Sequence, residues 1–201
     1  MHPNPAFRKE TTAKNLDFAR QRGFGVLSVN GPEGPLLAHV PFLLNEAGSE
    51  ADLHLLRSNP IARCGAREAV IAVSGPDGYV SPDWYKAADQ VPTWNYIAVH
   101  LRGTLIPLPD DALRDMLDRQ SAHFERRLAP KSPWSAEKMT PEVLARMMRS
   151  IRPFRLDIEE VQGTWKLNQN KPDAVRESAA SMVGEGFGQD LARLAKRMLD
   201  V

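Results

Sequence analysis

The sequence has a single cysteine, Cys64, among its 201 residues. One cysteine forms no disulfide within the chain and provides no cysteine cluster for a metal. The sequence also lacks a run of about 18 consecutive apolar residues, the length that a membrane-spanning helix requires. Its amino terminus lacks the basic segment and apolar run of a secretion signal. These absences predict a cytoplasmic protein that is not attached to a membrane.

An excess of charge of one sign is absent too. The 26 Lys and Arg residues nearly balance the 25 Asp and Glu residues, and the formal net charge is +1. Proteins built to bind nucleic-acid backbones usually carry a clear positive excess, so the charge does not support DNA binding. The composition is that of an ordinary globular chain. We expect one domain over residues 1–176, with residues 177–201 as a C-terminal helical extension.

Several catalytic and binding motifs are missing. The five histidines show no spacing suited to a metal pair, and we expect no metal site. No strand leads into a glycine-rich dinucleotide or phosphate loop, which disfavours a doubly wound nucleotide-binding fold. No Gly-x-Ser-x-Gly elbow occurs, so hydrolase chemistry has no anchor in this sequence.

The segment 93–105 is the most informative feature that is present. Its residues alternate between two chemically different faces, which is the period of a half-buried strand. One face carries Ile97, Val99, Leu101 and Leu105 and is expected to pack in a core. The other carries Trp94, Tyr96, His100, Arg102 and Thr104 and is available for a ligand or a partner.

Other segments predict a mainly β (α+β) protein. Two alternating runs, 25–30 and 36–44, flank a Gly-Pro-Glu-Gly turn and predict a hairpin. In a strand over 154–167 the apolar positions change from even to odd numbers, which predicts a β-bulge near Glu159 and Glu160. The remaining expected elements are strands at 51–58 and 68–74, a loop at 75–85, and helices at 12–22 (capped by Thr12), 60–66, 110–127, 141–151 and 191–199. Strands at short spacing with inserted helices indicate a small antiparallel barrel with peripheral helices.

Two polar segments are candidates for ligand contacts. Arg57-Ser58-Asn59-Pro60 combines a cation, a hydroxyl and the free N–H groups of a helix start, which together suit a phosphate. The alternative is capping of the helix by Asn59, with Arg57 solvated. The segment 163–172 concentrates amides and cations after an aromatic residue and could bind a flat heterocycle. The alternative there is a strand end whose amides satisfy turn backbone.

Five blocks together resemble the PaiB family, in order and in approximate spacing. They are residues 39–44 (HVPFLL), 57–60 (RSNP), 75–85 (GPDGYVSPDWY), 91–96 (VPTWNY) and 165–170 (WKLNQN). The resemblance runs from about Phe7 to Pro172. It implies an FMN-binding split β-barrel of antiparallel strands with peripheral helices, as in pyridoxamine-phosphate oxidases and flavin reductases.

The same resemblance implies a homodimer with FMN at the subunit interface. By analogy, the FMN phosphate is expected near Arg57, Ser58 and Asn59. The flavin ring is expected beside Ala38, His39, Val40 and Pro41, and it is approached, in part from the other subunit, by Trp94, Asn95, Tyr96, Lys166 and Gln169.

Family members are commonly labelled negative transcriptional regulators. The sequence itself shows no helix-turn-helix, and the basic side chains at 141–152 and 191–199 are interpreted as solvated helix faces. The alternative function is a flavin-dependent oxidoreductase or flavin reductase that uses NAD(P)H with a small acceptor. No catalytic acid or base is identified. A third alternative keeps the barrel but gives it haem or a deazaflavin, with His39 or His100 as the residues to inspect.

Overall fold

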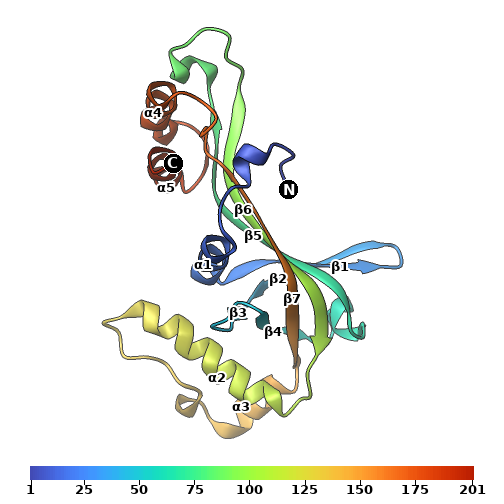
Figure 1. Cartoon of the computed structure of the whole chain (residues 1–201). Coiled ribbons are helices and arrows are strands. Elements are labelled where there is room, and N and C mark those ends of the chain that lie inside the picture. The colour runs from blue at the N-terminus through green and yellow to red at the C-terminus, as the bar shows by residue number, and fades with distance from the viewer. The chain divides into compact units, whose positions relative to one another are not determined.

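A computed structural model describes all residues, 1–201, and its centre is an eight-stranded β-sheet (Figure 1). The strands are β1 (Phe24–Gly31), β2 (Gly34–Pro41), β3 (Leu43–Leu44), β4 (Glu50–Leu56), β5 (Arg67–Val80), β6 (Thr93–Pro107), β7 (Ile151–Lys166) and β8 (Gly188–Gln189). Their order is β2-β1-β5-β6-β7-β4-β3, and β8 pairs with β5. β1 pairs antiparallel with β2 and β5, and β4 with β3 and β7. The predicted antiparallel β architecture is therefore confirmed.

Five α-helices lie before, between or after the strands. They are α1 (Thr12–Arg22), α2 (Ala112–Glu125), α3 (Pro141–Met148), α4 (Asp173–Met182) and α5 (Leu191–Leu199). Short 3₁₀ turns complete the set: η1 (Pro5–Phe7), η2 (Pro60–Arg63), η3 (Pro82–Tyr85), η4 (Arg126–Leu128), η5 (Ala136–Lys138) and η6 (Val183–Glu185). None of the helices is both long enough and apolar enough to cross a membrane.

Helix α1 has the predicted bounds but a different N-cap. The hydroxyl of Thr11, rather than that of Thr12, accepts a hydrogen bond from the backbone N–H of Lys14 at 3.2 Å. Gly23 follows the end of the helix with φ +59, a conformation that glycine adopts without strain. A β-carbon at Gly23 would also lie 2.7 Å from the ring of Phe124. Glycine is therefore required at this position both by the backbone and by the neighbouring helix α2.

The predicted hairpin is present, but its second strand is interrupted. Gly31 pairs with Gly34 across the turn, and Figure 1 shows β1 and β2 as one ribbon that turns back on itself. The strand expected over 36–44 is divided into β2 and β3 at Phe42. The backbone N–H of Phe42 donates to the carbonyl of Gly23 at 3.0 Å and so continues the register of the β1–β2 pair beyond the end of β2. Phe42 is buried at this break.

Two other expectations need correction. The helix expected at 60–66 is the single 3₁₀ turn η2. Residues 75–80 were expected in a loop because Gly75 and Pro76 are common turn formers, yet β5 continues through them to Val80. A β-carbon at Gly75 would lie 2.6 Å from the ring of Phe18 and 3.0 Å from the β-carbon of Ile97. This glycine permits close packing within a strand, and tertiary contact outweighs its turn propensity.

The three longest strands differ in how they present their buried faces. β6 keeps one face buried throughout, and the face predicted for the core is the buried one. β7 changes phase as predicted, since Phe154 and Leu156 are buried before Glu159 and Glu160, and Trp165 and Leu167 after them. β5 also changes phase, from odd-numbered buried residues up to Gly75 to even-numbered ones from Pro76.

The chain forms two compact units that are discontinuous in sequence. Unit 1 contains residues 1–18, 73–100 and 161–201, and unit 2 contains residues 19–72 and 101–160. In unit 1, α4 and α5 pack against each other (Figure 1), and the side chains of Leu191 and Leu194 lie close to Gly78 of β5. The expected division of the chain at residue 176 stays a prediction; α4 runs across that position.

We expect Gly103→Ala to destabilise the protein strongly. A β-carbon there would lie 1.8 Å from the carbonyl oxygen of Asp157 and 3.1 Å from the backbone nitrogen of Glu159. No side-chain rotation relieves a clash with backbone, so β6 and β7 would have to separate. The free energy of unfolding, measured in urea, should fall by about 3 kcal/mol or more.

Gly65→Ala is the matched control, because no atom lies within 4 Å of the β-carbon it would add. That variant should change the free energy of unfolding by less than about 0.5 kcal/mol. Equal stability of the two variants would contradict the close approach at Gly103.

Candidate functional site

In unit 2, the four residues predicted beside a flavin ring lie on β2. This strand ends the order of the sheet, so the backbone groups on its outer side are not used by another strand. Ala38 and Val40 are buried, whereas His39 is exposed and stacks on Phe24 with ring centroids 6.4 Å apart. Pro41 is half-buried. The buried pair fixes the strand in the core and leaves its edge available for hydrogen bonds.

The predicted phosphate segment, Arg57-Ser58-Asn59, links β4 to η2, and β2 packs against both of these elements. The two predicted groups of unit 2 therefore lie on neighbouring elements. Asn59 caps η2, with its side-chain oxygen accepting the N–H of Ile61 at 2.9 Å. The capping alternative is thus correct for Asn59. Ser58 is exposed.

Arg57 is held by two contacts that the sequence did not predict. Its Nε donates to the carbonyl of Arg149 at 3.0 Å, and its guanidinium pairs with Asp110 at 2.7 Å. The ion pair is open to solvent, since the side chain of Arg57 is 41% exposed and that of Asp110 is 64% exposed. Exposed pairs of this kind contribute little to stability, so an anionic ligand can displace the carboxylate at low cost.

Asp110 also has a different role from the one expected. The sequence predicts a helix from residue 110, but α2 begins at Ala112 and Asp111 is its N-cap. The backbone carbonyl of Asp110 accepts the N–H of Leu113 at 3.2 Å, which leaves its carboxylate for Arg57. Arg57 is far from Asp110 and Arg149 along the chain, so no local sequence pattern predicts these contacts.

In unit 1, the block Trp94-Asn95-Tyr96 lies at the start of β6 and divides between its two faces. Trp94 and Tyr96 share one face, and the indole N–H of Trp94 donates to Asp77 at 3.0 Å. Burial raises the pKa of the Tyr96 hydroxyl, which therefore stays a hydrogen-bond donor at neutral pH. Asn95 is fully buried on the opposite face, beside the core residue Ile97 along the same strand.

Asn95 is the least satisfied of these residues. Neither the oxygen nor the nitrogen of its side-chain amide has a hydrogen-bond partner within the chain. A buried amide without partners is costly, and such groups are rare in folded proteins unless a ligand, a water or another chain satisfies them. Asn95 faces the core with Ile97, away from the face that carries Trp94 and Tyr96, so the structure as it stands does not present its amide to a ligand on that face.

Lys166 and Gln169 follow on β7 and on the turn after it. The amine of Lys166 donates to the hydroxyl of Thr93, and burial lowers the pKa of that amine. Gln169 folds back on its own turn, accepting the N–H of Leu167 at 2.8 Å and donating to the carbonyl of Trp165. The alternative in which amides satisfy turn backbone is therefore correct for Gln169. Lys166 remains next to the start of β6.

Aromatic residues that were not named as site residues gather near Trp94. The rings of Tyr79 and Phe187 are stacked at 5.2 Å, and Trp94 approaches both edge-on. Phe187 is 61% exposed and is positioned by a hydrogen bond from the N–H of Tyr79 to its carbonyl at 3.1 Å. Tyr79 belongs to the block 75–85 that carried the family resemblance, whereas Phe187 lies outside all five blocks.

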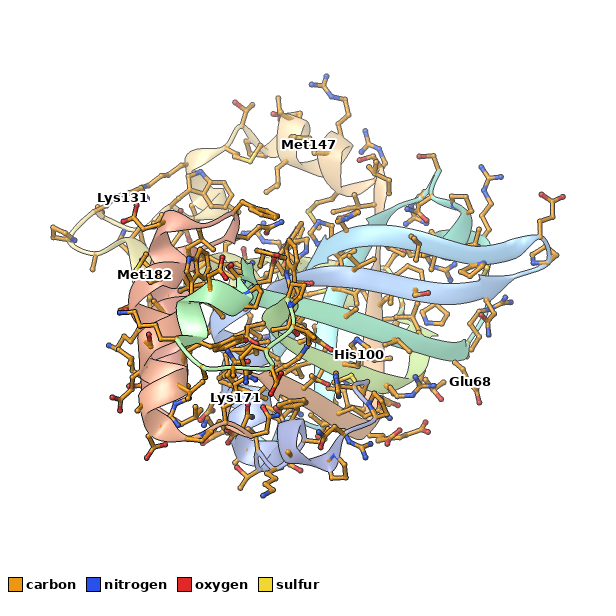
Figure 2. All side chains as sticks on the ribbon, turned by 90° about the horizontal axis from the view of Figure 1, so that it is seen from above. Glu68, His100, Lys131, Met147, Lys171 and Met182 are labelled. Carbon is orange, nitrogen blue, oxygen red and sulfur yellow. The ribbon has the colours of Figure 1, made fainter.

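The loop residues after β7 are fixed by a second tyrosine. The hydroxyl of Tyr85 donates to the side-chain oxygen of Asn168 at 3.3 Å. Lys171, labelled in Figure 2, places its amine 4.3 Å from the centroid of the Tyr85 ring. Asn168 has a positive φ of 65, a conformation that asparagine tolerates better than most residues. This packing sets the direction of the chain between Lys166 and α4.

The two histidines that were candidates for another cofactor lie in different units. His39 is exposed on β2 in unit 2, and His100 is half-buried on β6 in unit 1. No group of three or more His, Cys, Asp or Glu side chains is placed to hold a metal ion. The structure gives these histidines no feature that singles them out as ligands.

Comparisons with known proteins identify the family and the fold. The family model described as "Putative FMN-binding domain" matches residues 1–160. The "Protease synthase and sporulation protein PAI 2" of Bacillus subtilis is 28% identical over 172 residues, which are 83% of this chain and 82% of that protein. The predicted resemblance to the PaiB family is confirmed.

Solved structures with low sequence identity share the fold. The FAD and haem binding protein from Mycobacterium smegmatis matches with a TM-score of 0.59 at 17% identity, over 91% of this chain and 82% of that one. The flavocytochrome Anf3 from Azotobacter vinelandii matches with a TM-score of 0.58 at 11% identity, over 82% and 72% of the two chains. The predicted antiparallel split-barrel fold with peripheral helices is confirmed.

We expect Asn95→Leu to stabilise the flavin-free protein. Leucine has a similar size and removes an unpaired buried amide, so the free energy of unfolding in urea should rise by about 1 to 2 kcal/mol. Asn15→Leu is the control, because Asn15 is also buried but accepts the indole N–H of Trp165 at 2.8 Å. That variant should be destabilised. A loss of stability in both would mean that Asn95 has a partner.

Proposed function

We propose that this chain, which belongs to the FMN-binding family whose model covers residues 1–160, binds FMN in the cytoplasm and acts as a flavin-dependent negative regulator of PaiB type. The observation that carries the proposal is that family match. It includes the predicted ring-binding and phosphate-binding segments, residues 38–41 and 57–59, and the block 94–96. Lys166 and Gln169 lie beyond it, so their part in the proposal rests on geometry.

Unit 2 would hold the phosphate end of FMN. Arg57 supplies a charge-assisted hydrogen bond and Ser58 an exposed hydroxyl, while Asn59 stays with its capping bond and keeps the turn in place. The free edge of β2 at Ala38–Pro41 would then face the flavin ring and supply backbone hydrogen bonds. The packing of β2 against β4 and η2 supports the assignment of both ends to one surface.

We further propose that the residues of unit 1 complete the site across a homodimer interface. Trp94 and Tyr96 would approach the ring from the partner subunit, while Asn95 lies behind them on the buried face of the same strand. A mixed polar and aromatic strand face is typical of an interface that encloses a ligand. Flavin supplies one- and two-electron chemistry, and the protein sets its orientation and electronics.

Regulation by direct DNA contact gains no support from the basic side chains near α3 and on α5. Arg152 donates to the carbonyl of Ala62 at 3.3 Å and lies over the ring of Phe154. Arg197 lies over the ring of Trp165, 5.7 Å from its centroid. These arginines serve the fold, and with a net charge of +1 the chain favours regulation through a protein partner or a small molecule.

The second candidate function is an oxidoreductase that passes electrons from NAD(P)H to a small acceptor. The observation in its favour is Lys166, whose amine is held beside Thr93 and whose pKa is lowered by burial. A cation near the ring would stabilise reduced, anionic flavin, and an amine with a lowered pKa also releases its proton more readily.

The first test is the visible absorbance spectrum of the full chain after saturation with FMN and removal of the excess by gel filtration. Retention of a flavin band at one FMN per chain is expected. Loss of the band would contradict FMN binding, and a haem band in the protein as purified would transfer the cofactor assignment to the histidines. Reduction of the bound flavin by NADH or NADPH with turnover would favour the oxidoreductase. Salt-dependent binding to a specific DNA sequence would favour a regulator that contacts DNA directly.

The phosphate assignment is tested by two variants with opposite expected effects. Arg57→Ala removes a charge-assisted bond worth about 1.5 to 3 kcal/mol and should weaken FMN binding by about tenfold to a hundredfold. Asp110→Asn removes the carboxylate that competes for Arg57 and should strengthen binding by a few-fold, on the order of 1 kcal/mol or less. Both affinities are measured by quenching of flavin fluorescence. If neither variant alters the affinity, the phosphate binds elsewhere.

A further inference from the structure

A charged pocket in unit 2 is lined by none of the residues assigned to FMN. It is a cavity of about 380 Å³ between α2 and the strands β3 and β4, a size that suits a small molecule. Its charged lining consists of Glu50, Asp52, Arg119, His123, Arg126 and Arg155. None of these residues belongs to the blocks that resemble the PaiB family, and none is needed by the proposed FMN site.

A buried carboxylate fixes two of the arginines. Asp52 is 5% exposed, and its two oxygens accept hydrogen bonds from Arg119 and Arg155, each at 2.9 Å. Asp115 and Glu50 hold the same guanidinium groups from the other side, at 2.7 and 3.3 Å. Arg119 and Arg155 therefore enter the pocket in fixed orientations, and neither must lose side-chain freedom when a ligand binds.

The two fixed arginines still have donors to offer. A guanidinium has five N–H groups, and the contacts to the carboxylates of Asp52, Asp115 and Glu50 engage only part of each set. Both carboxylates of the lining are occupied by these arginines, so they offer little to a cation. The groups that remain unpaired in the pocket are N–H donors of the two arginines, and they favour a ligand with negatively charged oxygens.

Arg126 adds a positive charge without an acidic partner. It is exposed on the turn η4, directly after α2, and no carboxylate pairs with it. Asp52, Glu50 and Asp115 pair with Arg119 and Arg155, so Arg126 is the arginine of the lining that lacks a carboxylate partner. The ring of His123 reports this positive charge, because its pKa is lowered by burial and then by Arg126, Arg127 and Arg20. The end of the pocket that holds His123 and Arg126 is therefore cationic, although the net charge of the chain is close to zero.

We propose that this pocket binds a small anion with a phosphate or carboxylate group, at a site separate from that of FMN. Arg126 and the remaining N–H groups of Arg119 and Arg155 contact the anion, and Asp52 is the positioning residue that holds the two fixed arginines. The competing explanation is structural: cations near the C-terminus of α2 complement the helix dipole and bind nothing. The two explanations differ in whether an added anion stabilises the protein at constant ionic strength.

The test uses the full chain saturated with FMN. Its melting temperature is followed while inorganic phosphate, and in a second arm citrate, replaces chloride at constant ionic strength. A saturable rise is expected, because an anion that binds only the folded state stabilises it by mass action. The arm with the lower half-saturation concentration distinguishes phosphate chemistry from carboxylate chemistry. A melting temperature that does not change in either arm would overturn the proposal.

Arg126→Ala and Arg127→Ala form a matched pair, since both residues are exposed neighbours in η4 but only Arg126 lines the pocket. The half-saturation concentration should rise by about tenfold or more in Arg126→Ala, the loss of one charge-assisted bond, and stay unchanged in Arg127→Ala. Equal losses in both variants would indicate a diffuse charge effect and contradict a site.

Two further measurements test whether the anion binds in this pocket and whether the pocket differs from the site of the FMN phosphate. Anion binding should raise the pKa of His123, followed by NMR, in the wild type but not in Arg126→Ala; an unchanged pKa in the wild type would contradict contact in this pocket. The phosphate titration is repeated without FMN. If phosphate stabilises only the FMN-free protein, the pocket is where the flavin phosphate binds, and the separate site is wrong.

Discussion

The structure depends on the pairing of its three longest strands, β5, β6 and β7. Only β6 keeps the same face buried along its length. β6 lies between β5 and β7 in the sheet and buries the same face from Asn95 to Leu105. In both neighbours the alternation of buried positions shifts by one residue. The shift lies at Gly75-Pro76 in β5 and between Leu156 and Trp165 in β7. The shift exchanges the side chains that face the core, so each neighbour buries one alternate set of residues before the shift and the other set after it.

This constraint explains which parts of the fold the sequence could predict. The faces of β6 follow a strict alternation, and the hairpin and α1 are marked by local turn and end signals. β5 was shortened in the prediction because Gly75 and Pro76 are turn formers, and only Phe18 and Ile97, distant in sequence, show why the strand continues. The cap of α1 was placed one residue late, since adjacent threonines give the same signal.

The candidate site was predictable as a set of segments, but the chemistry of single side chains was not. Asn59 and Gln169 complete hydrogen bonds within a few residues of themselves. Arg57 is held by a carbonyl 92 positions away. The arginine pocket depends on Asp52 meeting partners 67 and 103 positions away. Contacts at such separations are set by topology, and a single sequence has no local pattern that reveals them.

The hydrogen bond from Trp165 to Asn15 joins residues 150 positions apart, and a β-carbon at Gly163 would fall 2.1 Å from the oxygen of that asparagine. The amino-terminal segment can therefore settle only after β7 has been made. Unit 2 needs nothing beyond residue 160, whereas unit 1 includes both ends of the chain. During synthesis on the ribosome, all residues of unit 2 are therefore made before residues 161–201, for which the first 18 residues must wait.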